Sequence, residues 1–469
     1  MEKDFGDMKT TGPLNTASSD NGEAGMGLHP AETVQHDAVF GEATKEGPNY
    51  RSLGWIATVV VMLKIQIGLG VLSLPFVFDT IGMIPGVILL LVVGIIATYT
   101  SWMVGVFKRN HPEVYSIDDA GAIIAGRIGR EFFAIAILLW MIFVAGSGML
   151  GVSIGLNAVS KHATCTAVFV FVACFFAFML ASIRTLGRLS WLAWVGMACI
   201  ATSIFLVTIA VGVQDRPALA PQDVPWKSDF KLFGNPTFAQ GVGAYGTLLF
   251  ACSATPTYYA LVAEMKDPRM YTRSLVIAQA GSTAIYLTIA VVVYYYCGSY
   301  VASPALGSAG PLIKRISYGI ALPGLIVTTT LFIHLPAKYL FVRFLRGSRH
   351  LTANTFTHWA TWLGCTFGSA IASYLIASGI PIFGGLVSLI GALFNAILAY
   401  QPAGAMWLFD NWKSERTWKW WLMAAWSMIL IVGGTFVTIT GTWGAITEIV
   451  QSLKDSAQPA PWTCADNSG

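Results

Sequence analysis

Charged residues are scarce in this chain. Only 11% of its 469 residues are Asp, Glu, Lys or Arg, against roughly 25% in a typical soluble protein. Hydrophobic residues make up 55% and the mean hydropathy is +0.64. This composition indicates a polytopic membrane protein. The formal net charge of +4 comes without a long Lys/Arg tract, so a nucleic-acid partner is not expected.

Motifs for metals, enzymes and channels are also lacking. The seven cysteines are scattered and form no CxxC pair, so neither a metal site nor a disulfide is predicted. The apolar runs contain no cluster of His, Asp and Glu and no nucleophile motif, which argues against an enzyme. No cofactor is expected. A channel is disfavoured because no filter-like motif repeats.

The chain divides into three parts by composition. Residues 1–50 are rich in Gly, Thr, Asp and Glu and are predicted to be a disordered cytosolic tail without a signal-peptide core. Residues 51–450 are predicted to be a transmembrane transporter domain, and residues 451–469 a short extracellular tail. The apolar runs predict about eleven membrane helices, at 55–78, 82–107, 131–157, 164–183, 190–213, 238–262, 272–297, 317–342, 356–377, 381–400 and 420–446.

Basic residues support this orientation. With the tail in the cytosol, most Lys and Arg residues fall in cytosolic connections, as the positive-inside rule requires. Lys314 and Arg315, near the start of the eighth span, count mildly against it. The moderately apolar segment 115–129, between the second and third spans, is interpreted as a helix at the inner interface.

Two of the predicted spans are interrupted near their middle. In the first, Gly68 and Gly70 are followed by Pro75, and in the sixth the segment 252–257 reads CSATPT. Unwound backbone at the depth of the hydrocarbon is tolerated only where it packs in protein or lines a polar cavity. Five spans separate the two breaks, so the second five-span unit would be inverted. Interrupted first helices in an inverted repeat are typical of secondary transporters. Ordinary Pro/Gly packing features are the alternative.

The residues around these breaks resemble a known family. The segment 64–75, KIQIGLGVLSLP, is similar to the first-helix motif of the amino acid/auxin permease family, and the segment 264–268, EMKDP, to its sixth-helix motif. The resemblance covers residues 50–450 and is greatest to fungal neutral amino-acid permeases of the methyltryptophan-resistance type. It implies an all-α LeuT-like fold, with a 5+5 inverted repeat and discontinuous first and sixth helices, and ion-coupled uptake of neutral amino acids.

The breaks also predict how an amino acid would bind. Free N–H groups at the start of the outer half of the first span would bind the carboxylate, and freed carbonyls of both spans would bind the ammonium. Aromatic side chains from several spans would line the side-chain pocket, although such residues more often pack against helices or lipid. The predicted substrate-binding residues are Ile67, Gly68, Leu69, Gly70, Val71, Phe143, Phe250, Cys252, Ser253, Thr255 and Tyr258.

Five further residues are candidates for ion coupling or gating. Lys64 is a charge deep in the first span. It occupies an ion site or carries a proton, or else it snorkels to the inner surface or pairs structurally. Thr328 and Thr329 would offer hydroxyls to a sodium site, although back-bonding to their own helix is commoner. Glu264 is either an inner gate or an ordinary juxtamembrane charge. His334 either carries a proton or is a packed histidine.

Proton coupling at the plasma membrane is the preferred interpretation, because the resemblance is to fungal permeases that work on a proton gradient. The residues themselves leave proton and sodium open. A membrane amino-acid sensor that transports nothing is the remaining alternative. The expected partners are therefore neutral amino acids, a coupling proton or sodium ion, and the lipid bilayer.

Overall fold

A computed structural model describes most of the chain. The described residues are 35–37, 41–43, 53–183, 186–214, 216–217, 220–221, 223, 226–345, 348, 350, 355–454 and 460–468, without the side chains of 35–37, 41–43 and 186–193. The chain forms two compact units, Met1–Pro48 and Asn49–Gly469. In the first, β1 (Gln35–Asp37) pairs antiparallel with β2 (Gly41–Ala43), with His36 opposite Glu42. The rest of the predicted tail lies outside the described residues.

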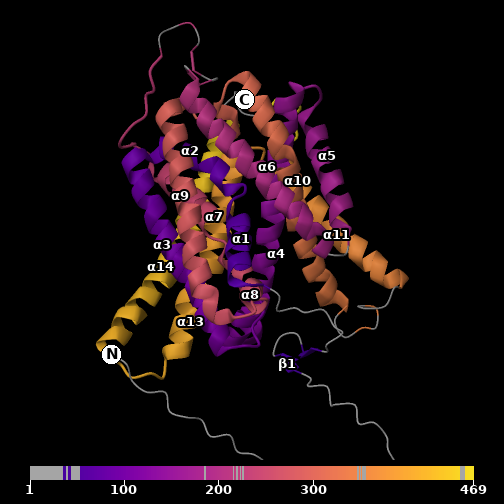
Figure 1. Cartoon of the computed structure of the whole chain (residues 1–469), viewed down its shortest axis with the longest axis vertical. Coiled ribbons are helices and arrows are strands. Elements are labelled where there is room, and N and C mark those ends of the chain that lie inside the picture. The colour runs from indigo at the N-terminus through magenta and orange to yellow at the C-terminus, as the bar shows by residue number, and fades with distance from the viewer. Residues whose placement is uncertain are drawn as a thin grey trace, which may run out of the picture. The chain divides into compact units, whose positions relative to one another are not determined.

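The second unit is built from helices that run side by side along the vertical direction of Figure 1. Among the described residues, eight helices are long and apolar enough to cross a membrane, and the bent pair 55–66 and 70–81 makes a ninth if it is counted as one span. The helices are α1 (Trp55–Gln66), α2 (Leu74–Ile81), α3 (Met83–Asn110), α4 (Ile117–Ser160), α5 (Thr166–Ala181), α6 (Leu186–Val213), α7 (Phe238–Cys252), α8 (Thr255–Ala263), α9 (Tyr271–Cys297), α10 (Pro311–Leu345), α11 (Phe356–Gly379), α12 (Phe383–Ile390), α13 (Gln401–Asn411) and α14 (Trp418–Lys454). Short 3-10 segments are η1 (Gly70–Ser73), η2 (Pro268–Met270), η3 (Gly298–Tyr300) and η4 (Ala305–Ser308), and η6 (Gly391–Tyr400) is a π-helix.

Each predicted span corresponds to one or two of these helices. Three predicted spans contain no single helix of full crossing length: the first consists of α1, η1 and α2, the fourth is the 16-residue α5, and the sixth consists of α7 and α8. The segment predicted to lie at the interface begins α4, where a capping box joins Ser116 and Asp119. The helix is then kinked at Ala125 and Gly126, and Gly126 has a φ of 62°, a value that glycine adopts without steric cost.

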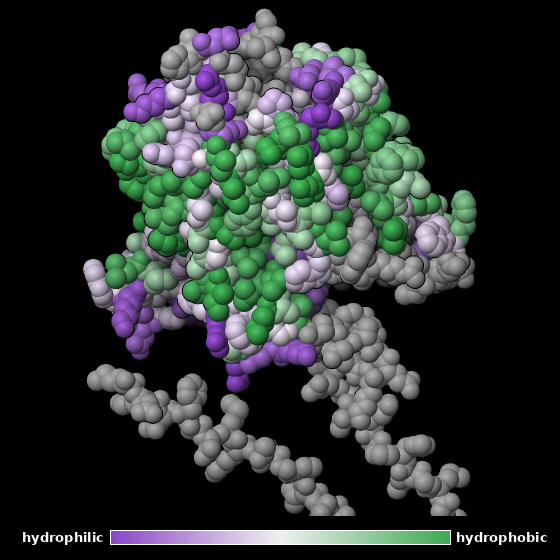
Figure 2. Space-filling view, turned by 45° about the horizontal axis from the view of Figure 1, so that its top comes forward, coloured by the Kyte–Doolittle hydropathy of each residue, from purple (hydrophilic) through white to green (hydrophobic). Residues whose placement is uncertain are grey.

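Large apolar side chains cover the flanks of the helices. Ile95, Ile209 and Ile439 are each at least 65% exposed in the absence of lipid. Figure 2 shows hydrophobic side chains across the middle of one face and hydrophilic ones toward its two ends. This distribution fits a protein whose middle is surrounded by hydrocarbon.

The cysteine prediction is wrong for one pair. Cys165, just before α5, forms a disulfide with Cys464, 299 residues away. The segment 460–468 also bonds to α4, where Asn157 Nδ2 donates to Asn467 Oδ1 (2.7 Å) and Asn467 Nδ2 donates to Ser153 Oγ (3.0 Å). The two cysteines meet only through this docking, so their pairing is a tertiary feature that spacing alone does not reveal.

Candidate functional site

The two predicted breaks are present as interruptions between paired helices. We call the end of the second unit where α2 ends the α2 side, and the end where α8 ends the α8 side; Figure 1 places these labels toward opposite ends. The segments 55–66 and 70–81 meet at an angle of 43°. In the sixth span α7 ends at Cys252 and α8 starts at Thr255, with Pro256 in its first turn.

The first break contains two glycines, one beside free space and one packed against a neighbouring helix. The helical backbone hydrogen bonds stop after Ile67 N donates to Leu63 O (2.8 Å), and they resume where Leu72 N donates to Leu69 O (3.3 Å). A Cβ placed on Gly68 would meet no heavy atom within 4 Å. A Cβ on Gly70 would lie 2.7 Å from the Cα of Ala251 on α7. Gly70 therefore brings the two broken spans into backbone contact, whereas Gly68 borders free space.

An amide side chain ties together the second break. Asn395 of η6 donates from Nδ2 to the carbonyls of Leu249 and Ser253, both at 3.1 Å. Its Oδ1 accepts from Trp140 Nε1 at 2.8 Å. Asn395 and Trp140 are both at least 96% buried. Because an unpaired carbonyl is costly in a water-free interior, this side chain stabilises the ending of α7.

Helix α9 joins the two breaks to each other. The Tyr286 hydroxyl lies 2.6 Å from Gln66 O in the first span and 3.1 Å from Ala251 O in the sixth. Gln66 Nε2 donates to Gln279 Oε1 (2.6 Å) and to Tyr258 OH (2.9 Å). All of these side chains are buried. The network holds both helix ends in one arrangement with fixed donors and acceptors.

The start of α8 is held by hydroxyls of α3. Thr255 Oγ1 lies 3.0 Å from Ser101 Oγ and 3.3 Å from Thr100 Oγ1. Tyr271 OH donates to Ser101 O at 2.8 Å. Thr255 is thus part of a hydroxyl cluster, so its position near the break is fixed by packing against α3.

The remaining predicted substrate residues divide between the breaks and their surroundings. Leu69 and Val71 are buried beside Gly70. Tyr258 is fully buried, and its hydroxyl accepts a hydrogen bond from Gln66 Nε2. Phe143 packs against Phe394, the neighbour of Asn395 in sequence, with ring centroids 5.2 Å apart. Partial burial is found for Ile67, Gly68 and Phe250, and nearly complete burial for Cys252 and Ser253.

The span-eight candidates have local partners. Thr328 and Thr329 each donate to the carbonyl four residues earlier, at 2.9 and 2.8 Å. A Cβ on Gly148 of α4 would lie 2.4 Å from Thr329 Oγ1, so this threonine packs against α4. His334 is fully buried, lies 3.0 Å from Ala181 O through Nδ1, and packs its ring on Trp362. These contacts are those of packed residues, and their ion roles remain predictions.

Lys64 and Glu264 lie toward the α8 side. The Lys64 ammonium lies 5.5 Å from the centre of the Trp194 ring on α6, in cation–π geometry. Glu264 follows α8, and its carbonyl accepts from Leu53 N at 3.2 Å. Burial raises the pKa of the Glu264 carboxyl, and the charge of Lys338 opposes that rise. Lys266 N donates in turn to Leu53 O at 2.9 Å, so the start of the first span is paired to the end of the sixth.

Several polar residues that contact the breaks were not predicted from the sequence. Gln66, Gln279 and Asn395 are amide side chains inside apolar spans, and Tyr286 and Trp140 carry the matching polar groups. The available signal was the amides themselves, because a strongly polar side chain at membrane depth is rare unless it has a partner.

Comparisons with known proteins agree with this geometry. The model of the family described as transmembrane amino acid transporter protein matches residues 51–447. A "Transmembrane transporter" of Gibberella moniliformis is 33% identical over 426 residues, covering 90% of both chains. The "N amino acid transport system protein" of Neurospora crassa is 31% identical over 434 residues, covering 90% of this chain and 91% of the relative.

More distant similarity extends to plants and to a solved structure. The Arabidopsis thaliana "Amino acid transporter AVT1H" is 26% identical over 401 residues, covering 81% of this chain and 86% of the relative. The inward-facing conformation of Mhp1 matches with a TM-score of 0.55 and 13% identity, covering 86% of this chain and 91% of that one. This last likeness shows a LeuT-like fold. The family model, which matches residues 51–447, and the relatives that are more than 30% identical place the chain in the family of transmembrane amino acid transporter proteins.

Proposed function

We propose that this protein imports neutral amino acids, aliphatic and aromatic, by proton symport with alternating access. The observation that carries the proposal is the pair of helix breaks in backbone contact at Gly70 and Ala251, with open space at Gly68. Such breaks offer both partial charges that a free amino acid needs, because helix starts are positive and freed carbonyls are negative.

The carboxylate is assigned to the first break. Gly68 borders free space, so a ligand oxygen can approach the backbone N–H groups between Gly68 and Val71 closely. The ammonium is assigned to carbonyls of the same two breaks, near Ile67 and Cys252. This assignment needs no acidic side chain. Asn395 and Tyr286 already bind other carbonyls of the breaks, so they act as supports for the site.

The side-chain pocket and membrane orientation complete the proposal. Phe143 and Phe250 are proposed to contact apolar side chains of substrates, which is consistent with a neutral range. We place the α8 side in the cytosol, because basic residues gather in the connections at that end. The disulfide then lies outside, where oxidising conditions preserve such bonds. The proposed location is the plasma membrane.

Uptake by the purified protein in liposomes tests this function. Labelled leucine and phenylalanine would be offered under an inward proton gradient, under an inward sodium gradient, and without either. We expect accumulation above the equilibrated level with protons alone. Accumulation that requires sodium would replace the proton by sodium as coupling ion. Binding without accumulation under either gradient would contradict transport and favour a sensor.

A further inference from the structure

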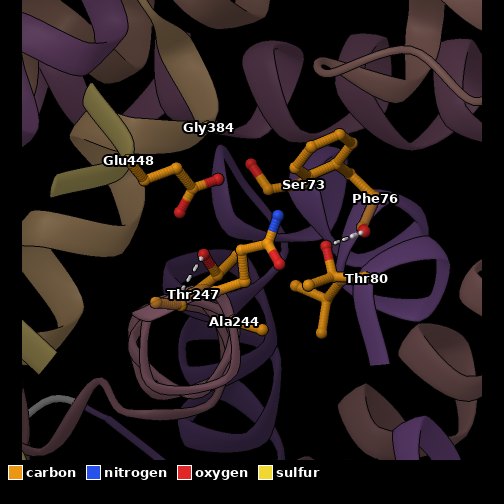
Figure 3. Close-up of a pocket in the computed structure, with 10 residues that line it drawn as sticks. Ser73, Phe76, Thr80, Ala244, Thr247, Gly384 and Glu448 are labelled. Carbon is orange, nitrogen blue, oxygen red and sulfur yellow. Dashed lines mark hydrogen bonds between the residues drawn. The ribbon is translucent and has the colours of Figure 1, made fainter. Parts of the chain in front are cut away.

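A small cavity lies on the α2 side, apart from the two breaks. It is enclosed by α2, α7, α12 and α14, and Figure 3 shows Ser73, Thr80, Thr247 and Glu448 around it. The cavity has a volume of about 10 Å³ for the centre of a water molecule, so it has room for roughly one water. None of the sequence-predicted residues belongs to this cavity.

Glu448 is the charged group of the cavity. It is half-buried and lies on α14, within a helix long and apolar enough to cross a membrane. A Cβ placed on Gly243 of α7 would lie 2.8 Å from Glu448 Oε2, so the carboxylate reaches the α7 backbone only because residue 243 is glycine. Glu448 lies two residues beyond the predicted span 420–446, near the end of α14 on the α2 side, where a half-buried carboxylate is still costly unless it is neutralised or has polar partners.

Ser73 supplies an independent sign of a ligand. Its side chain is 1% exposed, and its buried hydroxyl has no hydrogen-bond partner among the described residues. In Figure 3 this hydroxyl points toward the Glu448 carboxylate. A buried hydroxyl without a protein partner calls for an explanation, and beside a polar cavity a bound water supplies one. Thr247 also lines the cavity, and its hydroxyl donates to Gly243 O at 3.4 Å.

The other residues of the cavity are uncharged. On α2 and α7 they are apolar, hydroxyl, amide or glycine residues, and α12 contributes Gly384. α2 also carries a charged residue, Asp79, but it does not line the cavity, and the charged groups near it are Asp229 and Lys231. Tyr245 of α7 faces Tyr400 at 3.2 Å between the hydroxyls. The remaining charges of α14, Lys419 and Lys454, lie at or near its ends. Glu448 is thus the group of this cavity that gains or loses charge.

We infer that Glu448 is the proton-binding site of the transport cycle, with a water held between its carboxylate and the Ser73 hydroxyl. The inference rests on the proposed proton symport. The carboxylate accepts one proton from water on the α2 side, becomes a neutral carboxylic acid, and returns the proton to water on the α8 side. A metal cation fits less well, because Glu448 is the one charged ligand among the oxygen-bearing side chains of the cavity, which also include Ser73, Thr80, Gln240 and Thr247, and hard cations favour sites with several carboxylate or carbonyl oxygens.

The location explains how proton binding would couple to transport. α2 and α7 are the halves of the broken spans on the α2 side, and Ser73, the last residue of η1 before α2, and Gly243 of α7 line the cavity with Glu448. Neutralising Glu448 removes the cost of enclosing a charge there. The α2 side therefore closes more readily when the proton is bound, which is the order that symport requires.

Glu448→Gln tests the inference in the full protein. In liposomes with an inward proton gradient, we expect this variant to lose leucine accumulation above the equilibrated level. Exchange of labelled for unlabelled leucine should persist, because the amino-acid site is separate, and its rate should no longer vary with pH. Glu113→Gln is the matched control, since Glu113 is a 59% exposed carboxyl outside the spans, and it should accumulate leucine like the wild type.

The outcomes separate the inference from the proposed function. If the wild type accumulates leucine with protons and Glu448→Gln does so equally, the assignment of Glu448 is overturned while proton symport stands. If the wild type itself does not respond to a proton gradient, proton symport fails, and Glu448 loses its role with it. If Glu448→Gln does not fold, the variant Ser73→Ala tests the inference instead. It should shift the pH at which uptake is half-maximal, and an unchanged pH profile would overturn the inference.

Discussion

The two helix breaks differ in how completely they are filled. At the break of the sixth span, Asn395, Gln279 and Tyr286 reach the carbonyls, and Thr255 is held by two hydroxyls of α3. At the break of the first span, Tyr286 again binds a carbonyl, but Gly68 borders free space. The comparison teaches that side chains hold most of the sixth-span break in place, whereas the first-span break keeps more of its backbone accessible to a ligand.

We expect the largest effect at the filled break. Asn395→Ala leaves Leu249 O, Ser253 O and Trp140 Nε1 without their partner, at a cost of about 2–4 kcal/mol for buried groups. The apparent Tm of the purified protein should fall clearly. Asn411→Ala is the control, because Asn411 donates to Trp407 O at a helix end, and it should change Tm little. Equal Tm values for the two variants would contradict Asn395 as the support of this break.

The two glycines of the first break should respond differently to alanine. Gly70→Ala forces a methyl group against the backbone of Ala251, which costs about 1–3 kcal/mol in a packed interior. Gly68→Ala meets open space and should leave Tm nearly unchanged. A thermal unfolding series on both variants checks this. A similar loss of Tm for both would show that the first break is as closed as the second.

Removal of the hydroxyl shared by the breaks should have a smaller effect. Tyr286→Phe withdraws the donor to Gln66 O and Ala251 O, worth about 1 kcal/mol net. Tyr296→Phe on the same helix is the control, because Tyr296 is 41% exposed. The Tm should fall for the first variant and hold for the second. If Tyr286→Phe leaves Tm unchanged, the breaks are not joined through α9.

The smallest effect is expected outside both breaks, in the long connection before α7. Burial tends to raise the pKa of Asp229, but hydrogen bonds from Ser299 and the charge of Lys231 outweigh it and leave the pKa below its ordinary value. A carboxyl with a lowered pKa stabilises the fold above its unfolded-state value and loses that contribution as pH falls.

Measurement of Tm against pH tests this sign. The wild type should lose Tm below about pH 4, the ordinary Asp range, and Asp229→Asn should lose less there. Because Asp229 is exposed, the difference should stay under about 1 kcal/mol. Curves that run parallel through this range would contradict the role of Asp229.

The spans and both breaks were predictable from the sequence, for local reasons. An apolar run of about 20 residues is required by bilayer thickness, and the closely spaced Gly68, Gly70 and Pro75 and the polar segment before Pro256 are local signals that a helix ends or restarts. The family resemblance likewise came from the continuous segments 64–75 and 264–268, and the family match confirms it.

Contacts between distant segments were not predictable in this way. Cys165 and Cys464 pair because the segment 460–468 docks on α4, and Asn395 reaches α7 because η6 packs there against Gly246. The neighbour of Thr329 is likewise set by packing, because a Cβ on Gly148 of α4 would lie 2.4 Å from its hydroxyl oxygen. Helical periodicity places a residue on a face of its helix, and only tertiary packing decides which neighbour that face meets.

Equilibrium binding of labelled leucine to the wild type and to Gly68→Ala tests the central claim most directly. The claim is that the open part of the first break receives the substrate carboxylate. The methyl group would occupy the ligand's space without disturbing the protein. We predict a loss of affinity of about tenfold or more, equivalent to roughly 1.4 kcal/mol, at an unchanged Tm. Unchanged leucine affinity in the folded variant would contradict the account.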